Sequence, residues 1–67
     1  MATLKWTDTL EIAIQLADSN PEVDPAQVRF TALMAMVMAL PEFDDVQDRC
    51  GERILEAIQQ AWIDEIA

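Results

Sequence analysis

The feature that most constrains the fold is the stretch from Phe30 to Leu40, in which every side chain after Thr31 is apolar. Leucine, methionine and alanine are strong helix formers, Thr31 can cap a helix and Pro41 can end one. The stretch predicts a helix from Ala32 to Leu40 that is apolar on every side and needs cover all round. It is far too short to cross a bilayer, which takes about 20 apolar residues. The cover must come from the rest of the chain or from a partner.

The chain around this stretch is short and strongly acidic. Its 67 residues suffice for one domain, residues 1–67, with a small core. Thirteen acidic and four basic side chains give a net charge of -9, so we expect no binding to nucleic acid or to an anionic membrane. Such a surface suits a basic protein or a hard cation. The single cysteine excludes an internal disulfide and no signal-peptide pattern is present, so we expect a cytoplasmic protein.

Helical spacing of apolar residues predicts three further helices, at about residues 9–19, 25–28 and 51–66. Asp8 followed by Glu11 gives the first helix a capping-box pattern. Asp24 before a proline is a typical start for the second. Residues 41–48 form an acidic loop with Phe43 as its one aromatic anchor. The predicted fold is therefore an all-α, small single-domain helical bundle.

Several acids stand where helix stability disfavours them. Asp64 and Glu65 lie in the last turn of the last predicted helix, where the negative end of the helix dipole costs up to about 1 kcal/mol for each acid. Like charges also recur every fourth residue, at Asp48, Glu52 and Glu56. Departures from local rules cluster at functional sites, so we interpret these acids as a ligand or partner face. The alternative is a solvated surface whose charge keeps the protein soluble.

The residue types offer little for catalysis. No histidine or tyrosine is present, which leaves no nucleophile paired with a base, and so small a domain has little room for a pocket that separates the pKa values of two carboxylates. We therefore expect no enzyme. Carboxylates without nitrogen or sulfur ligands favour hard, weakly held ions such as magnesium, calcium, manganese or ferrous iron. No EF-hand spacing is present, so any metal site should be weak.

The sulfur and tryptophan side chains have ordinary structural interpretations. Cys50 beside Arg49 is interpreted as an incidental thiol. Three methionines spaced two apart point in different directions on a helix, so they fit core packing better than a copper site. The residues expected in or at the rim of the core are Met34, Met36, Met38, Trp6 and Trp62.

Seven segments carry a further signal through their order and spacing. They are Leu4-Lys5-Trp6-Thr7-Asp8, Glu11-Ile12, Asp24-Pro25, Val28-Arg29-Phe30-Thr31, Phe43-Asp44-Asp45, Ile54-Leu55-Glu56-Ala57-Ile58 and Trp62-Ile63-Asp64-Glu65. Together they resemble the IscX family of bacterial iron-sulfur cluster assembly proteins over nearly the whole chain. The resemblance implies a winged-helix-like arrangement of helices and docking on the basic surface of cysteine desulfurase, near the site that frataxin uses. It also implies weak binding of ferrous iron, modulation of sulfur transfer and ferredoxin as a further partner.

The resemblance also assigns functional residues. The acids that it implies for partner binding are Asp8, Glu11, Asp44, Asp45, Glu56, Asp64 and Glu65. The acids that it implies for weak iron binding are Asp8, Glu11, Asp64 and Glu65. Two alternative functions remain. One is a ferrous iron donor to the assembly scaffold, and the other is an acidic helix-turn-helix-like interaction module, whose DNA-binding form the charge opposes.

The chain departs from the family pattern in two places. After the Phe-Thr pair, Ala32, Met34 and Met36 replace the usual Asp-x-His-x-Trp. After Asp45 the acid run stops, because Val46 follows. No functional residue is therefore assigned to the apolar helix.

Overall fold

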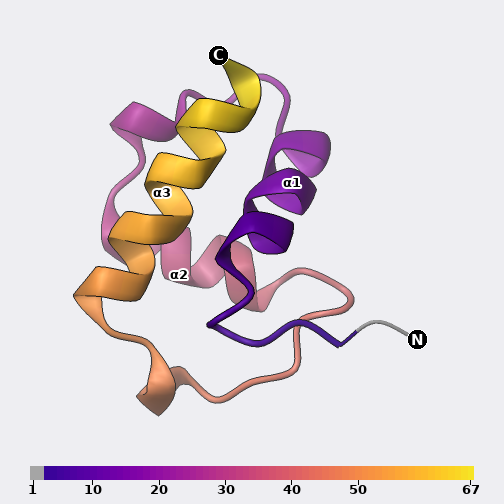
Figure 1. Ribbon diagram of the computed structural model, residues 1–67, viewed down its shortest axis with the longest axis vertical. Coiled ribbons are helices and arrows are strands. Elements are labelled where there is room, and N and C mark those ends of the chain that lie inside the picture. The colour runs from indigo at the N-terminus through magenta and orange to yellow at the C-terminus, as the bar shows by residue number, and fades with distance from the viewer. Residues whose placement is uncertain (1–2) are drawn as a thin grey trace.

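The computed structural model describes residues 3–67 and contains three α-helices joined by loops and single turns. The elements are α1 (Thr9–Ser19), the 3-10 turn η1 (Pro25–Gln27), α2 (Phe30–Met38), the 3-10 turn η2 (Gln47–Arg49) and α3 (Glu52–Ile66). Helices α1 and α3 lie side by side and rise in the same direction, and α2 crosses behind them (Figure 1). The predicted all-α single domain is confirmed.

The described residues hold one isolated bridge, between Leu4 and Phe43, and no strand. The winged-helix-like arrangement stays a prediction, because this part of the chain has no strand that would form a wing. Within residues 3–67, none of the helices has the length and apolar character that a membrane span requires.

Helix α1 has the predicted bounds but not the predicted cap. Asp8 occupies the N-cap position, yet its side chain makes no bond to the helix. Its carboxylate instead accepts the backbone N–H of Lys5 at 2.9 Å, and its backbone carbonyl accepts the N–H of Ile12. The prediction of a capping box at Asp8 and Glu11 is therefore wrong, because the Asp8 carboxylate bonds to the turn before the helix.

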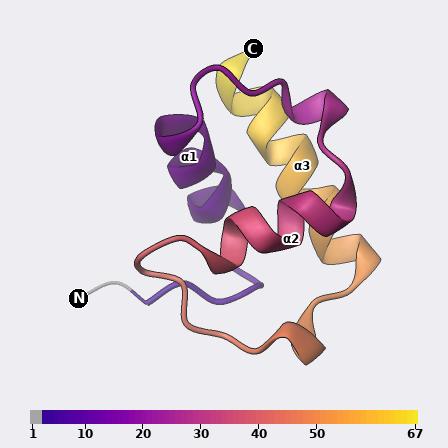
Figure 2. The ribbon, with the colours of Figure 1, turned by 180° about the vertical axis from the view of Figure 1, so that it is seen from behind.

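Helix α2 departs most from expectation. It begins at Phe30, two residues early, so Thr31 lies in its first turn instead of capping it. Only Leu33 and Val37 are buried within the helix, and Met38 is 41% exposed. Within the described residues α1 and α3 cover only the inner side of α2, so the rest of the chain does not supply the cover expected all round, and cover of the outer side by a partner stays a prediction. Seen from behind, no other element described in the structure lies over α2 (Figure 2).

The core lies between α1 and α3 and extends to the inner side of α2. Trp62 of α3 is fully buried and Trp6 is 1% exposed, which confirms both as core residues. Met34 and Met36 are half-buried and pack against this core. Each large side chain buried here contributes about 1.5 to 3 kcal/mol. The largest fully buried side chains are Trp6, Trp62, Ile12, Leu16, Leu33, Ile58, Val37 and Pro25.

The turn before α2 is held by one predicted cap and one unexpected side chain. Asp24 accepts the N–H of Ala26 at 3.0 Å, as its sequence position predicted. The expected short helix is a single 3-10 turn. Gln59 of α3 donates its amide to the carbonyls of Pro25 at 2.9 Å and Val28 at 3.3 Å. This amide therefore fastens η1 and the start of α2 to α3.

We expect Gln59→Ala to destabilise the fold by about 1 to 2 kcal/mol, because the Pro25 and Val28 carbonyls both lose the Gln59 amide and Pro25 keeps only the Val28 N–H at 3.3 Å. Urea unfolding followed by circular dichroism measures the change in free energy. Gln60→Ala is the matched control, since Gln60 is exposed and bonds only to Asp64, also exposed. Equal destabilisation in the two variants would contradict this role of the Gln59 amide, because alanine is itself a better helix former than glutamine.

Candidate functional site

The segment before α1 is paired with the acidic loop after α2. The Leu4 N–H donates to the carbonyl of Glu42 at 2.8 Å, and the Asp44 N–H donates to the carbonyl of Leu4 at 2.9 Å. The rings of Trp6 and Phe43 meet edge to face, with centroids 4.7 Å apart and an interplanar angle of 68°. Phe43 is thus the aromatic anchor of the loop, as predicted. The pairing positions both aspartates that follow it.

Asp45 is bonded inside the molecule. Its carboxylate accepts the backbone N–H of Trp6 at 3.1 Å and that of Val46 at 2.8 Å, and the Arg49 Nε lies 3.9 Å away. The Trp6 N–H is the main cause that holds the pKa of Asp45 below its ordinary value, against the opposing effect of partial burial. With its side chain 9% exposed, Asp45 fixes the loop and has little surface left for a partner.

Asp44 has the opposite environment. Its side chain is 81% exposed, and its carboxylate lies 3.8 Å from the Lys5 ammonium, which also donates to the Asp44 backbone carbonyl. An ion pair this exposed contributes at most about 1 kcal/mol. The Asp44 carboxylate is therefore accessible to a partner.

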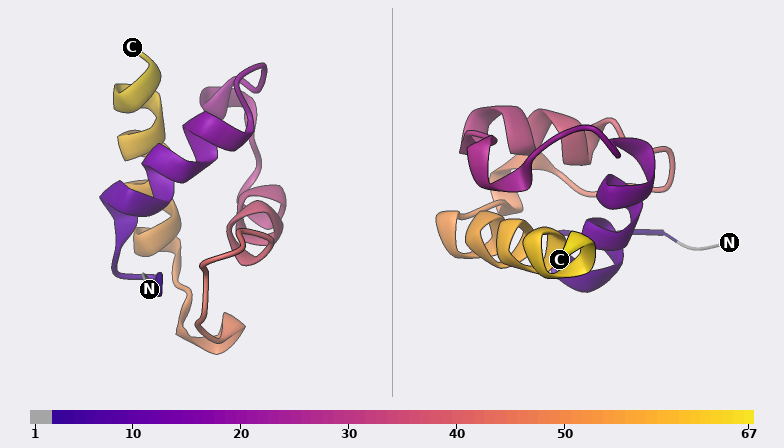
Figure 3. Two further views of the ribbon diagram at one scale, coloured as in Figure 1. Left: turned by 90° about the vertical axis from the view of Figure 1, so that its right-hand side faces the viewer. Right: turned by 90° about the horizontal axis from the view of Figure 1, so that it is seen from above.

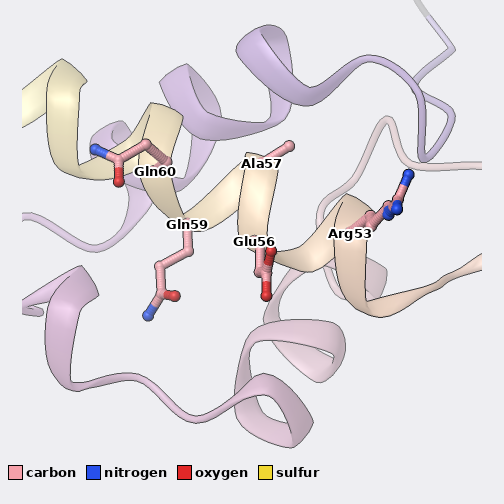
Figure 4. A pocket seen from close by; sticks show the side chains of 5 residues that line it. All are labelled: Arg53, Glu56, Ala57, Gln59 and Gln60. Carbon is pink, nitrogen blue, oxygen red and sulfur yellow. The ribbon is translucent and has the colours of Figure 1, made fainter.

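Three predicted acids lie on the exposed side of α3. Glu56, Asp64 and Glu65 all face solvent, and Asp64 accepts the Gln60 amide at 3.2 Å. Among residues 3–67, no lysine or arginine lies within 4.0 Å of these three carboxylates. The Arg53 side chain points away from Glu56 (Figure 4). These carboxylates are available to an outside cation.

A surface hollow of about 590 Å³ lies along α3. Its lining residues all come from this one helix, so it is a shallow polar surface and not a cleft between elements. Figure 4 shows their side chains spread along the helix. The lining residues are Arg53, Glu56, Ala57, Gln59 and Gln60.

The four acids predicted to bind iron are not gathered at one place. Asp8 precedes α1 and Glu11 lies in its first turn, whereas Asp64 and Glu65 lie in the last turn of α3. Because α1 and α3 rise in the same direction, the two pairs stand at opposite ends of the helix pair (Figure 3). Within residues 3–67, no group of three or more potential ligands is arranged to hold a metal ion. Iron binding by these acids stays a prediction.

Sequence reasoning missed Glu42, which the fold brings to α1. The Gln15 amide donates to the Glu42 carboxylate at 2.7 Å across a groove of about 530 Å³. The groove lies between α1 and the loop after α2, and its lining residues are Glu11, Ile14, Gln15, Asp18, Ser19, Pro41 and Glu42. No local pattern marks Glu42, because its neighbours on α1 are distant in sequence.

Cys50 is half-buried at the end of η2, and its Sγ lies 3.9 Å from the Gly51 carbonyl. Partial burial raises the pKa of the Cys50 thiol, so the side chain stays protonated at neutral pH. This environment agrees with an incidental thiol.

Comparison with known proteins decides the family. The family model described as iron-sulphur cluster assembly matches residues 4–67, which include the paired loop and all three α-helices. The chain belongs to the IscX family of iron-sulfur cluster assembly proteins. The family resemblance seen in the sequence is thereby confirmed. The chain is also similar to the uncharacterized protein PA3808 of Pseudomonas aeruginosa, at 62% identity over 63 residues that span 94% of this chain and 96% of that protein.

We expect Asp45→Asn to lower the midpoint of thermal unfolding at pH 7, because an amide cannot accept both N–H groups as the carboxylate does. The lowered pKa fixes the sign of the pH dependence. The stabilisation is complete above the ordinary carboxyl pKa of 3.8 and is lost as the pH falls through the lower value of the folded protein.

The difference between wild type and Asp45→Asn should therefore shrink as the pH falls below the ordinary carboxyl pKa of 3.8, as thermal scans at several pH values can measure. Asp44→Asn is the control, because its exposed side chain has no comparable set of bonds. A difference that stays constant as the pH is lowered until the Asp45 carboxylate is protonated would contradict this account of Asp45.

Proposed function

We propose that this IscX-family protein is a non-catalytic adaptor of cytoplasmic iron-sulfur cluster assembly that docks its acidic surface on the basic surface of cysteine desulfurase. The observation that carries the proposal is a row of exposed polar side chains along α3. Its members recur every fourth residue and are Glu52, Glu56, Gln60 and Asp64.

The spacing of this row matters electrostatically. Residues four apart are neighbours on a helix surface, so Glu52 and Glu56 repel each other by a few tenths of a kcal/mol. Twelve positions at about 1.5 Å per residue make the row about 18 Å long. It faces away from the buried side of α3, which carries Leu55 and Ile58. A basic partner surface would relieve this repulsion and would also meet the Asp64 carboxylate at the other end of the row.

The end of α3 adds a second unfavourable charge. Asp64 and Glu65 lie in the last turn, where the unpaired carbonyls already make the helix end negative, and no basic residue is present there. Cations of a partner would interact with the two carboxylates and with the helix end together. A basic partner is therefore attracted more strongly to these acids at the end of α3 than it would be to the same acids on a loop.

The remaining exposed acids have secondary roles in this proposal. Asp8, Glu11 and Asp44 are accessible but lie at the start of α1 and in the loop, apart from Asp64. They raise the long-range attraction, which speeds encounter and is screened beyond about 8 Å at physiological salt. Asp45 contributes by holding the loop.

The ferrous iron donor has less support. A donor needs a defined stoichiometric site, and no group of three potential ligands is found within residues 3–67. Weak iron binding by surface carboxylates would compete with docking for the same charges. The adaptor is therefore the function that the arrangement of charges supports best.

We expect calorimetric titration into purified cysteine desulfurase to give micromolar affinity at about 50 mM salt and at least tenfold weaker binding at about 200 mM. The double variant Asp64→Lys, Glu65→Lys should weaken binding by more than about tenfold. It removes two carboxylates and adds two cations at the end of the row.

The charge-matched control is Asp18→Lys, Glu22→Lys, which changes the net charge equally at exposed positions outside α3. We expect it to weaken binding by less than about threefold, because it acts only through long-range attraction. No binding at either salt concentration would disprove the adaptor. Equal loss in both variants would disprove its placement on α3.

A further inference from the structure

The groove between α1 and the loop after α2 continues into a second hollow. The second hollow has a volume of about 220 Å³, and its lining residues are Ser19, Asn20, Met36, Ala39, Leu40 and Pro41. Ser19 and Pro41 line both hollows, so the two form one continuous groove. We call it the α1–loop groove. The loop after α2 passes beneath α1 (Figure 2).

One half of the α1–loop groove is acidic. Glu11 and Asp18 are two helical turns apart on the same side of α1, about 10 Å along its axis, and Glu42 approaches from the loop. No lysine or arginine of residues 3–67 lies within 4.0 Å of these three carboxylates. The Gln15 amide holds Glu42 in place at 2.7 Å. This half offers three carboxylates, of which the Gln15 amide fixes Glu42, and none of the three has a cation beside it within the described residues.

The other half is mainly apolar. Met36 is half-buried, Ala39 is exposed and Leu40 is 7% exposed at the base. The residues from Pro25 to Pro41 include no acid, so the charge changes sharply along the groove. An occupant that fits both halves must be basic at one end and aliphatic at the other.

We propose that the α1–loop groove binds an extended segment of a partner protein that carries two basic residues followed by one large aliphatic residue. The basic side chains meet Glu11, Asp18 and Glu42, and the aliphatic side chain enters the hollow at Ala39. This inference goes beyond docking on cysteine desulfurase, because the groove is built from α1 and the loop and not from the α3 row. It adds a second recognition element with its own sequence preference.

A second copy of this chain does not fit the groove. Only four basic residues are present, and two of them, Lys5 and Arg49, already lie beside Asp44 and Asp45. The other two, Arg29 and Arg53, are far apart in sequence, so no segment of this chain combines two free basic residues with a following aliphatic one. The occupant is therefore a different protein.

The test uses the full chain labelled with nitrogen-15 and a synthetic peptide of about ten residues. The peptide carries two arginines followed by a leucine, with glycine and serine elsewhere. We expect amide shifts confined to the outer side of α1 and to residues 36–42. Replacing the peptide leucine with serine should weaken binding about fivefold, because the aliphatic contact is lost. Replacing both arginines with glutamine should weaken it further.

The protein variant for this test is Glu11→Gln, Asp18→Asn, whose side chains make no hydrogen bond or ion pair within the described residues. We expect it to bind the peptide at least fivefold more weakly than wild type. The charge-matched control is Glu56→Gln, Glu65→Gln on α3, which should change the affinity by less than about twofold.

Three outcomes would overturn the inference. They are shifts centred on α3, equal weakening in the two protein variants, and indifference to the peptide leucine. The first two would reduce the effect to general attraction by net charge, and the third would remove the apolar half. Since cysteine desulfurase is not used here, the groove can fail this test while docking at α3 stands.

Discussion

The fold depends on the way Trp6 joins three parts of a very short chain. Its indole is 1% exposed in the core, its ring packs edge to face on Phe43, and its Nε1 donates to the Val46 carbonyl at 2.7 Å. Its backbone N–H donates to Asp45. A domain of this size has few elements with which to close its core. One tryptophan therefore replaces the extra helix or sheet that a larger domain would use, and it fixes the acidic loop at the same time.

The buried faces of α1 and α3, the two helices that carry most of the core, were predictable from the sequence. The buried face of α2 was not. Helices α1 and α3 have one apolar side each, which defines both their length and their buried face. Helix α2 is apolar all round, so its periodicity marks no buried face. Which side is covered depends on the area that α1 and α3 can offer, and that is a property of the assembled chain. The exposed Met38 is the consequence.

The acids also show that tertiary contacts, and not local sequence, decide which side chains are exposed. Asp44 and Asp45 are adjacent and chemically identical, yet one side chain is 81% exposed and the other 9%. The difference arises from the Trp6 N–H, which reaches only Asp45 and is far away in sequence. Glu42 likewise meets α1 only through tertiary contact. Sequence identifies the class of side chain that matters, and long-range hydrogen bonds decide which members remain free.

The distribution of charge ties these features to function. No acid occurs from Pro25 to Pro41, so the carboxylates lie on α1, on α3 and in the loops. Their mutual repulsion destabilises the folded state, which a small core stabilises only modestly. A basic partner reduces this repulsion wherever it binds. Because α2 crosses behind α1 and α3, a partner on the outer side of α3 leaves α2 uncovered (Figure 1). The apolar half of the α1–loop groove, which begins at the end of α2, then stays open while α3 is occupied.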